Sequence, residues 1–134
     1  ASTMTTYVLA TDSVDASARI CDYLQNRLAA DDTVHAVNSK RGGDETTAEE
    51  IRFGEDALNV VTSRLGAAAT VETHQFVRGN EPATDVLECA ASVDADEVLI
   101  AVRHRTPAGK ALFGSVAQTI LLEAERPVVS IPRE

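Results

Sequence analysis

The sequence has no apolar run that approaches the roughly 20 residues needed to span a membrane. Its first ten residues, ASTMTTYVLA, lack the basic and then long apolar regions of a signal peptide. These absences argue against a membrane span and predict a cytoplasmic protein. Of the 134 residues, 44% are hydrophobic, which is enough for one domain, residues 1–134, with a core of its own.

Cysteine and histidine are scarce. The only cysteines are Cys21 and Cys89, each inside an apolar pattern typical of a helix, and the chain has no C-x-x-C motif. The histidines, His35, His74 and His104, show no metal-ligand spacing. We therefore expect two buried thiols and neither a metal site nor a redox site.

Positive charge is scarce too, because 12 lysines and arginines stand against 21 acidic residues and give a net charge of -9. General nucleic-acid binding needs a basic face, so nucleic acid is not an expected partner. Only Lys40 and Lys110 are lysines. An acidic chain with so little lysine is typical of halophilic proteins, and an ordinary acidic surface is the alternative.

The chain does contain a regular alternation of strand-like and helix-like segments. Apolar and β-branched runs predict five strands, at Thr6–Ala10, Thr33–Val37, Thr70–Val77, Val98–Val102 and Val128–Ile131. Helical spacing of apolar residues predicts a first helix over Ala16–Ala29 and three more that begin near Thr47, Pro82 and Ser115. The polar, glycine-rich segment Asn38–Thr47 predicts a loop.

This βαβαβαβαβ order predicts an α/β, Rossmann-like three-layer sandwich, in which a five-stranded parallel sheet has helices on both faces. If the strand order is 3-2-1-4-5, the winding reverses between the first and fourth strands. Ligands of such sheets bind outside the carboxyl ends of the strands at that reversal. The loops expected there are Thr11–Ser13 and Arg103–Ser115.

The second of these loops carries positive charge in an otherwise acidic chain, through Arg103, Arg105 and Lys110. It ends at Gly114-Ser115, where we expect Ser115 to cap the next helix by accepting a hydrogen bond from an early backbone N–H. Free N–H groups at a helix N-terminus favour an anion such as phosphate. The alternative is a solvated loop whose charges pair with nearby acids.

Over essentially its whole length the sequence resembles the universal stress protein family. The resemblance rests on VLATDSVDAS after the first strand, VRGNEPATDVLECA before the fourth strand, and DEVLIAVRHRTPAGKALFGSVAQTILLEAERPVVSIP at the end. Nucleotide-binding members carry Gly-x-x-Gly, nine residues, and then Gly-Ser or Gly-Thr. The last pair of that motif falls on Gly114-Ser115.

The resemblance implies a stress-response or regulatory protein that binds ATP or a related adenine nucleotide, with or without Mg²⁺. Asp12 would contact adenine or ribose, Val37 would line the adenine pocket with its backbone, and backbone N–H groups of residues 114–116 would hold phosphate. A helix cap is the alternative for Asp12, and core packing for Val37. The expected nucleotide-binding residues are Ala10, Thr11, Asp12, Val37, Ala101, Arg103, His104, Arg105, Gly109, Lys110, Gly114, Ser115 and Val116.

Two positions depart from the family motif, because Ala101 and His104 stand where its first two glycines would be. In the motif those glycines let the backbone lie against ribose and phosphate, and a bulky ring at His104 disfavours a positive φ there. Gly109 could supply flexibility elsewhere in the loop. The alternative function is therefore a dimeric interaction module of the same fold that binds no nucleotide.

The resemblance also implies a homodimer through the last strand, residues 128–131, because an unpaired apolar edge is open to adventitious pairing. An enzyme is not expected. The chain has neither G-x-x-x-x-G-K-[ST] nor G-x-G-x-x-G, and no triad or metal cluster accompanies the loop. We assign no catalytic residue and expect at most slow ATP hydrolysis through phosphate positioning.

Overall fold

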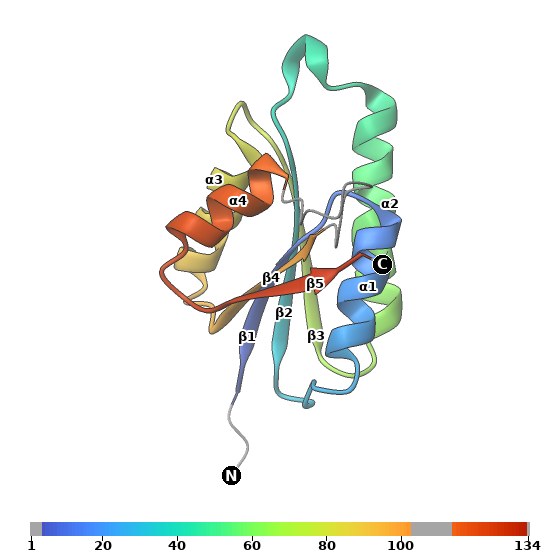
Figure 1. Ribbon diagram of the computed structural model, residues 1–134. Coiled ribbons are helices and arrows are strands. Elements are labelled where there is room, and N and C mark those ends of the chain that lie inside the picture. Colours follow the sequence, from blue (N-terminus) through green and yellow to red (C-terminus); the bar gives the residue numbers. More distant parts are fainter. Residues whose placement is uncertain (1–3, 103–113, 134) are drawn as a thin grey trace, which may run out of the picture.

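One parallel sheet organises the molecule, which a computed structural model describes over residues 4–102 and 114–133 (Figure 1). Its strands are β1 (Thr6–Ala10), β2 (Thr33–Lys40), β3 (Thr70–Val77), β4 (Glu97–Val102) and β5 (Val128–Pro132). All neighbouring strands pair in parallel, in the order β3-β2-β1-β4-β5. The predicted fold class and strand order are therefore confirmed.

Helices cover both faces of the sheet. They are α1 (Val14–Leu24), α2 (Ala48–Leu65), α3 (Pro82–Ser92) and α4 (Ser115–Glu123), with a short 3-10 helix, η1 (Gly43–Glu45), before α2. Figure 1 shows α1 and α2 on one side of the sheet and α3 and α4 on the other. Successive strand residues accordingly point into two different cores. On β1, Leu9 packs in the core with α1 and α2, whereas Val8 packs in the core with α3 and α4.

The helix starts follow the predicted capping chemistry in two places. Thr47 is the N-cap of α2, and its hydroxyl accepts a hydrogen bond from Glu50 N at 3.1 Å. Pro82 is the first residue of α3, where its missing N–H costs no helical hydrogen bond. The predicted range of the first helix is wrong at both ends, because Ser13 caps it two residues early and it ends at Leu24.

The early end of α1 has a local cause in the buried carboxylate of Asp32, which is 3% exposed. Its two oxygens accept hydrogen bonds from Ala29 N and Thr5 N, each at 2.9 Å. These bonds fix the chain that follows α1 against the start of β1. A helix continued to Ala29 would compete for the same backbone N–H group.

The loop predicted from Asn38 is also wrong at its start. β2 continues to Lys40, and Asn38, Ser39 and Lys40 pair in register with Gln75, Phe76 and Val77 of β3. Asn38 is fully buried and Ser39 is 9% exposed. Both polar side chains have hydrogen-bond partners on other elements, which removes the cost of burying them.

Both cysteines are buried as free thiols. Burial raises the pKa of Cys21 to about 11 and also raises the pKa of Cys89, so each thiol stays protonated at neutral pH. Among residues 4–102 and 114–133, no three His, Cys, Asp or Glu side chains form a group that could hold a metal ion. Over the same residues, no helix is both long and apolar enough to cross a membrane.

Candidate functional site

A cavity of about 570 Å³ opens at the carboxyl end of the sheet, next to the N-terminal ends of α3 and α4. This is the place where the winding reverses between β1 and β4. One wall is apolar and is formed by Ala10, Val37, Pro82, Val86, Ile100, Val102 and Ile120. The polar lining residues are Thr11, Asp12, Ser39, Lys40, Arg41, Thr46, Ser115 and Arg133, and the small or apolar residues Ala16, Ala101, Gly114, Val116 and Ala117 complete the lining. Its size and mixed lining are typical of small-molecule sites.

The structure brings together the predicted site residues that it describes. Ala10, Thr11, Asp12, Val37, Ala101, Gly114, Ser115 and Val116 all line this one cavity. They come from the end of β1 and the turn that follows it, from β2 and β4, and from the start of α4. The other predicted residues, Arg103, His104, Arg105, Gly109 and Lys110, lie outside the described residues.

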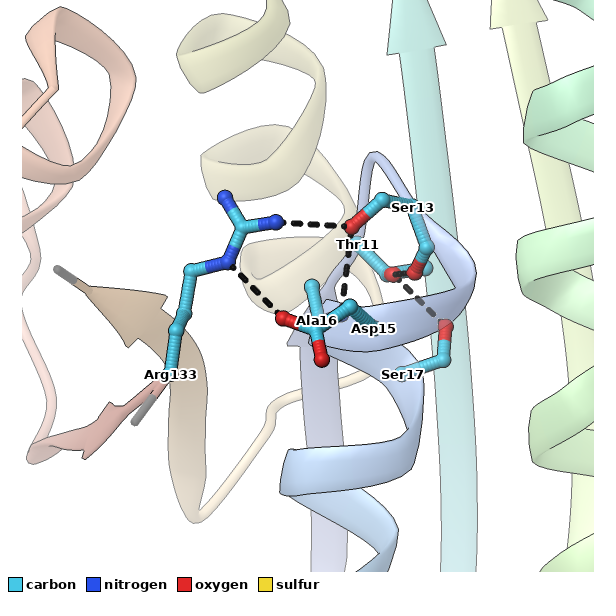
Figure 2. A network of polar contacts seen from close by, with 6 residues as sticks. All are labelled: Thr11, Ser13, Asp15, Ala16, Ser17 and Arg133. Carbon is cyan, nitrogen blue, oxygen red and sulfur yellow. Dashed lines mark hydrogen bonds and ion pairs between the residues drawn. The ribbon is translucent and has the colours of Figure 1, made fainter.

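The turn between β1 and α1 is fastened by buried polar groups (Figure 2). Thr11 Oγ1 lies 2.6 Å from Ser17 Oγ, which in turn donates to Ala57 O of α2 at 2.7 Å. Since the single hydroxyl hydrogen of Ser17 goes to Ala57, the Thr11 hydroxyl is left to donate to two acceptors, Ser17 Oγ and Ser13 O at 3.1 Å. The turn is thus fixed to α2, and Asp12 lies exposed beside the cavity.

The helix cap after this turn is Ser13, whose Oγ accepts a hydrogen bond from Ala16 N at 3.1 Å. The alternative interpretation of Asp12 as the cap is therefore wrong. Val37 is 1% exposed and packs in the core as well as lining the cavity. Its carbonyl oxygen already accepts a hydrogen bond from Thr11 N at 2.9 Å, so a ligand could use only the second lone pair of that oxygen.

The expected cap at α4 is also wrong. Gly114 is the N-cap, and Ser115 is already the first helical residue, so its hydroxyl is not placed to reach the N–H groups one turn ahead. Among the described residues no side chain caps this helix. Its first N–H groups therefore need an acceptor from elsewhere, and they lie where Gly114, Ser115 and Val116 line the cavity.

Positive charge gathers in this cavity although the chain is strongly acidic. Among the described lining residues, Lys40, Arg41 and Arg133 are basic and Asp12 is the one acid. Arg41 forms an ion pair with Glu81 on the rim. Sequence reasoning missed all three basic residues. The available signal was their position, since each directly follows or ends a strand whose carboxyl end faces the cavity.

Arg133 holds a defined position at the start of α1. Its Nη2 donates to Ser13 Oγ at 3.2 Å, and its Nε lies 3.4 Å from Asp15 Oδ2. Figure 2 shows the remaining terminal nitrogen pointing away from both partners. The backbone N–H of Arg133 also donates to Val102 O at 2.8 Å, which fixes this residue beside the end of β4.

A buried carboxylate behind the cavity lining, Asp85, fixes the position of Ser39, which lines the cavity. Asp85 of α3 is fully buried and accepts hydrogen bonds from Ser39 Oγ at 2.6 Å, Asn80 Nδ2 at 2.9 Å and Arg78 Nε at 3.0 Å. Burial alone would raise the pKa of Asp85, but these hydrogen bonds and the charge of Arg78 hold that pKa below its ordinary value. Asp85 is therefore ionised at neutral pH.

A parallel sheet wound in two directions, with a part-apolar and part-basic cavity at the reversal, defines an α/β protein with a cavity at its switch point. Residues 4–132 match the family model described as the Universal stress protein family. The chain belongs to the universal stress protein family.

Relatives are similar to this chain in sequence, and those of known structure are similar in fold as well. The structure of a universal stress protein from Archaeoglobus fulgidus is 32% identical, has a TM-score of 0.80, and aligns over 96% of this chain and 99% of that one. The structure of the universal stress protein from the same organism in complex with dAMP is 30% identical, with a TM-score of 0.72 over 95% and 97% of the chains. A universal stress protein from Mycolicibacterium smegmatis (strain ATCC 700084 / mc(2)155) is 35% identical over 95 residues, or 71% of this chain and 72% of that protein.

Proposed function

We propose that this protein binds an adenine nucleotide in the cavity at the carboxyl end of its sheet, and that its role is regulatory rather than catalytic. The observation that carries the proposal is one cavity that joins apolar residues to basic side chains and to helix N–H groups that no side chain of the described residues caps. A flat base needs the apolar surface, and phosphate needs the N–H groups and the basic side chains. The complex of the 30% identical Archaeoglobus relative with dAMP supports the same ligand class.

The two ends of the cavity suit the two ends of a nucleotide. The base would lie on the apolar wall near Val37, Val86 and Ile100, and the phosphate would lie at the start of α4. Mass spectrometry of small molecules released from gently purified protein tests this proposal. We expect AMP, ATP or a related adenine nucleotide in near-equal amount to the chain. Folded protein that carries none and binds none in titration, in low salt and in molar KCl with Mg²⁺, would favour the interaction module instead.

Replacing Arg133 by alanine should weaken the binding of AMP by about tenfold or more and leave adenosine binding nearly unchanged. A charge-assisted hydrogen bond to phosphate contributes about 1.5–3 kcal/mol, and each 1.4 kcal/mol is tenfold in affinity. The substitution also leaves the Asp15 carboxylate without its arginine partner. The negative charge of Asp15 would then repel phosphate more strongly. Calorimetric titration of each ligand measures the effect.

The matched control is Arg19→Ala, which removes the same charge from an exposed position of α1 that does not line the cavity. It should bind AMP and adenosine as the unaltered protein does. If Arg133→Ala weakens both ligands equally, Arg133 shapes the cavity and does not contact phosphate.

We also propose that β5 pairs with its counterpart in a second copy of the chain. Pro127 O accepts from Val98 N and Arg133 N donates to Val102 O, so the backbone groups of odd-numbered residues in β5 face β4. The groups of Val128 and Ser130 consequently face the open edge of the sheet. A symmetric pair of these edges would satisfy them.

Proline at position 130 should turn a dimer into a monomer. Ser130→Pro removes an N–H group that faces the open edge and leaves the bonds to β4 in place. Sedimentation velocity measures the change in mass. Ser130→Ala keeps the N–H group and should remain dimeric. A dimer that persists in Ser130→Pro would show that another surface makes the contact.

A further inference from the structure

One polar side chain among the apolar residues of the cavity, that of Ser39, donates its hydroxyl hydrogen to a group outside the cavity lining. Ser39 lines the cavity and is 9% exposed. Its Oγ lies 2.6 Å from Asp85 Oδ2. An ionised carboxylate can only accept hydrogen bonds, so Ser39 is the donor in this contact. Toward any other partner, the Ser39 oxygen can therefore only accept a hydrogen bond.

The Asp85 carboxylate is held in this state from several sides. Arg78 Nε and Asn80 Nδ2 both donate to Oδ1, while Oδ2 receives the Ser39 hydroxyl. The Arg78 Nη2 atom also lies 3.0 Å from Oδ1. No described side chain with a buried polar atom is left unsatisfied in this region or elsewhere among the described residues. The orientation of the Ser39 hydroxyl is therefore fixed before a ligand arrives.

Several residues around Ser39 in the cavity lining are apolar. Val37 is its neighbour on the same face of β2, and Pro82 and Val86 of α3 line the cavity on the Asp85 side. A flat aromatic ring on this wall would meet apolar surface on its face and the Ser39 oxygen at its edge. That edge must present a hydrogen-bond donor, since a second acceptor there would be repelled and left unsatisfied.

We propose that Ser39, oriented by Asp85, recognises the base through its exocyclic amino group and discriminates against purines that have a carbonyl group or hydrogen at that position. This inference rests on the proposed nucleotide binding and adds the residue that selects the base. Ser39 is the contacting residue, and Asp85 is a positioning residue. The selectivity arises from the direction of one hydrogen atom, which the folded chain sets.

The test compares three nucleotides that differ at one edge of the base: AMP, purine riboside 5′-monophosphate and IMP. The unaltered protein should bind AMP about 10- to 100-fold more tightly than IMP, with purine riboside monophosphate between them. Ser39→Ala should bring the three affinities to within about threefold of one another. Ser92→Ala, which removes a hydroxyl from the far end of α3 outside the cavity, should keep the original order.

Asp85→Asn tests the positioning role, because an asparagine amide can donate to Ser39 and release its hydrogen toward the cavity. The preference should then shift from AMP toward IMP, a reversal that a loss of structure alone cannot produce. If Asp85→Asn fails to fold because Arg78 loses its partner, the Ser39→Ala comparison decides the matter. Equal binding of AMP and IMP by the unaltered protein, or an unchanged order in Ser39→Ala, overturns the inference and leaves nucleotide binding standing. Failure to bind any of the three overturns nucleotide binding itself.

Discussion

Alanine at position 54 should destabilise the protein by about 2–4 kcal/mol, although alanine in place of a helical glycine normally stabilises by about 1 kcal/mol. Gly54 lies in the middle of α2, where the helix crosses close to β2 and β3. A Cβ atom there would lie 2.1 Å from Asn38 Oδ1 and 2.7 Å from both Asn38 Cγ and Gln75 Nε2. Distances this short require the helix or the side chains to move.

The side chains it would displace form a buried polar connection. Asn38 Nδ2 donates to Thr11 O at 2.9 Å, and Gln75 Nε2 donates to Asn38 Oδ1 at 3.1 Å and to Ile51 O at 2.9 Å. Breaking these bonds leaves buried groups unsatisfied, at about 1–3 kcal/mol for each group. Movement of Asn38 would also release the Thr11 turn, which forms part of the cavity.

Urea denaturation of a double-mutant cycle with Asn38→Ala measures the effect. Asn38→Ala should destabilise on its own, because Thr11 O loses the donor Asn38 Nδ2 and Gln75 Nε2 keeps only its bond to Ile51 O. It also removes the two Asn38 atoms that the new methyl group meets and leaves only the 2.7 Å contact with Gln75 Nε2, so Gly54→Ala should cost less in that background than in the unaltered protein. Additive effects, or a gain in stability from Gly54→Ala alone, would show that α2 has room at this position.

Aspartate at position 114 should lower the affinity for AMP by about 100-fold or more without lowering stability. Gly114 is the N-cap of α4, and its φ of -63° suits any residue. No atom of the described residues lies within 4 Å of a Cβ built there. Aspartate is a better N-cap than glycine, and its charge favours a helix N-terminus, so the free energy of unfolding should rise by about 0.5 kcal/mol.

The same charge would occupy the place where we propose phosphate binds. Two like charges about 4 Å apart repel by several kcal/mol near a protein surface, and the new carboxylate would also take the N–H groups that phosphate needs. Gly114→Asn is the matched control, since it has the same shape and caps equally well without the charge. Calorimetry with AMP and thermal unfolding of both variants separate the effects. If Gly114→Asp binds AMP as tightly as Gly114→Asn does, the phosphate lies elsewhere.

The strands were predictable because each depends on a local pattern, whereas their order stayed a hypothesis that the structure confirms. β1 and β3 have the predicted bounds, and β4 and β5 differ from theirs by one residue. Apolar runs bounded by polar turns predict such strands, and alternation with helices then predicts a parallel sheet. The Ser and Thr residues that precede helices were harder to interpret, because a neighbouring residue can take the cap, as Ser13 and Gly114 do.

What could not be predicted depends on partners far away in the sequence. Asn38 and Ser39 look like loop residues, yet they continue β2 because Thr11, Gln75 and Asp85 satisfy them. The same applies to Arg133, which joins the cavity only once β5 is placed beside β4. The cavity residues at the ends of β1 and β4 were predicted, whereas the basic residues at the ends of β2 and β5 were missed because the bounds and neighbours of those strands depend on distant partners.

Titration calorimetry of the folded, nucleotide-free protein with AMP, in low salt and in molar KCl, tests the central claim most directly. The account predicts saturable binding of one AMP per chain in at least one of these conditions, and its loss in Gly114→Asp but not in Gly114→Asn. A folded protein that gives no saturable binding at millimolar AMP in either condition would contradict it.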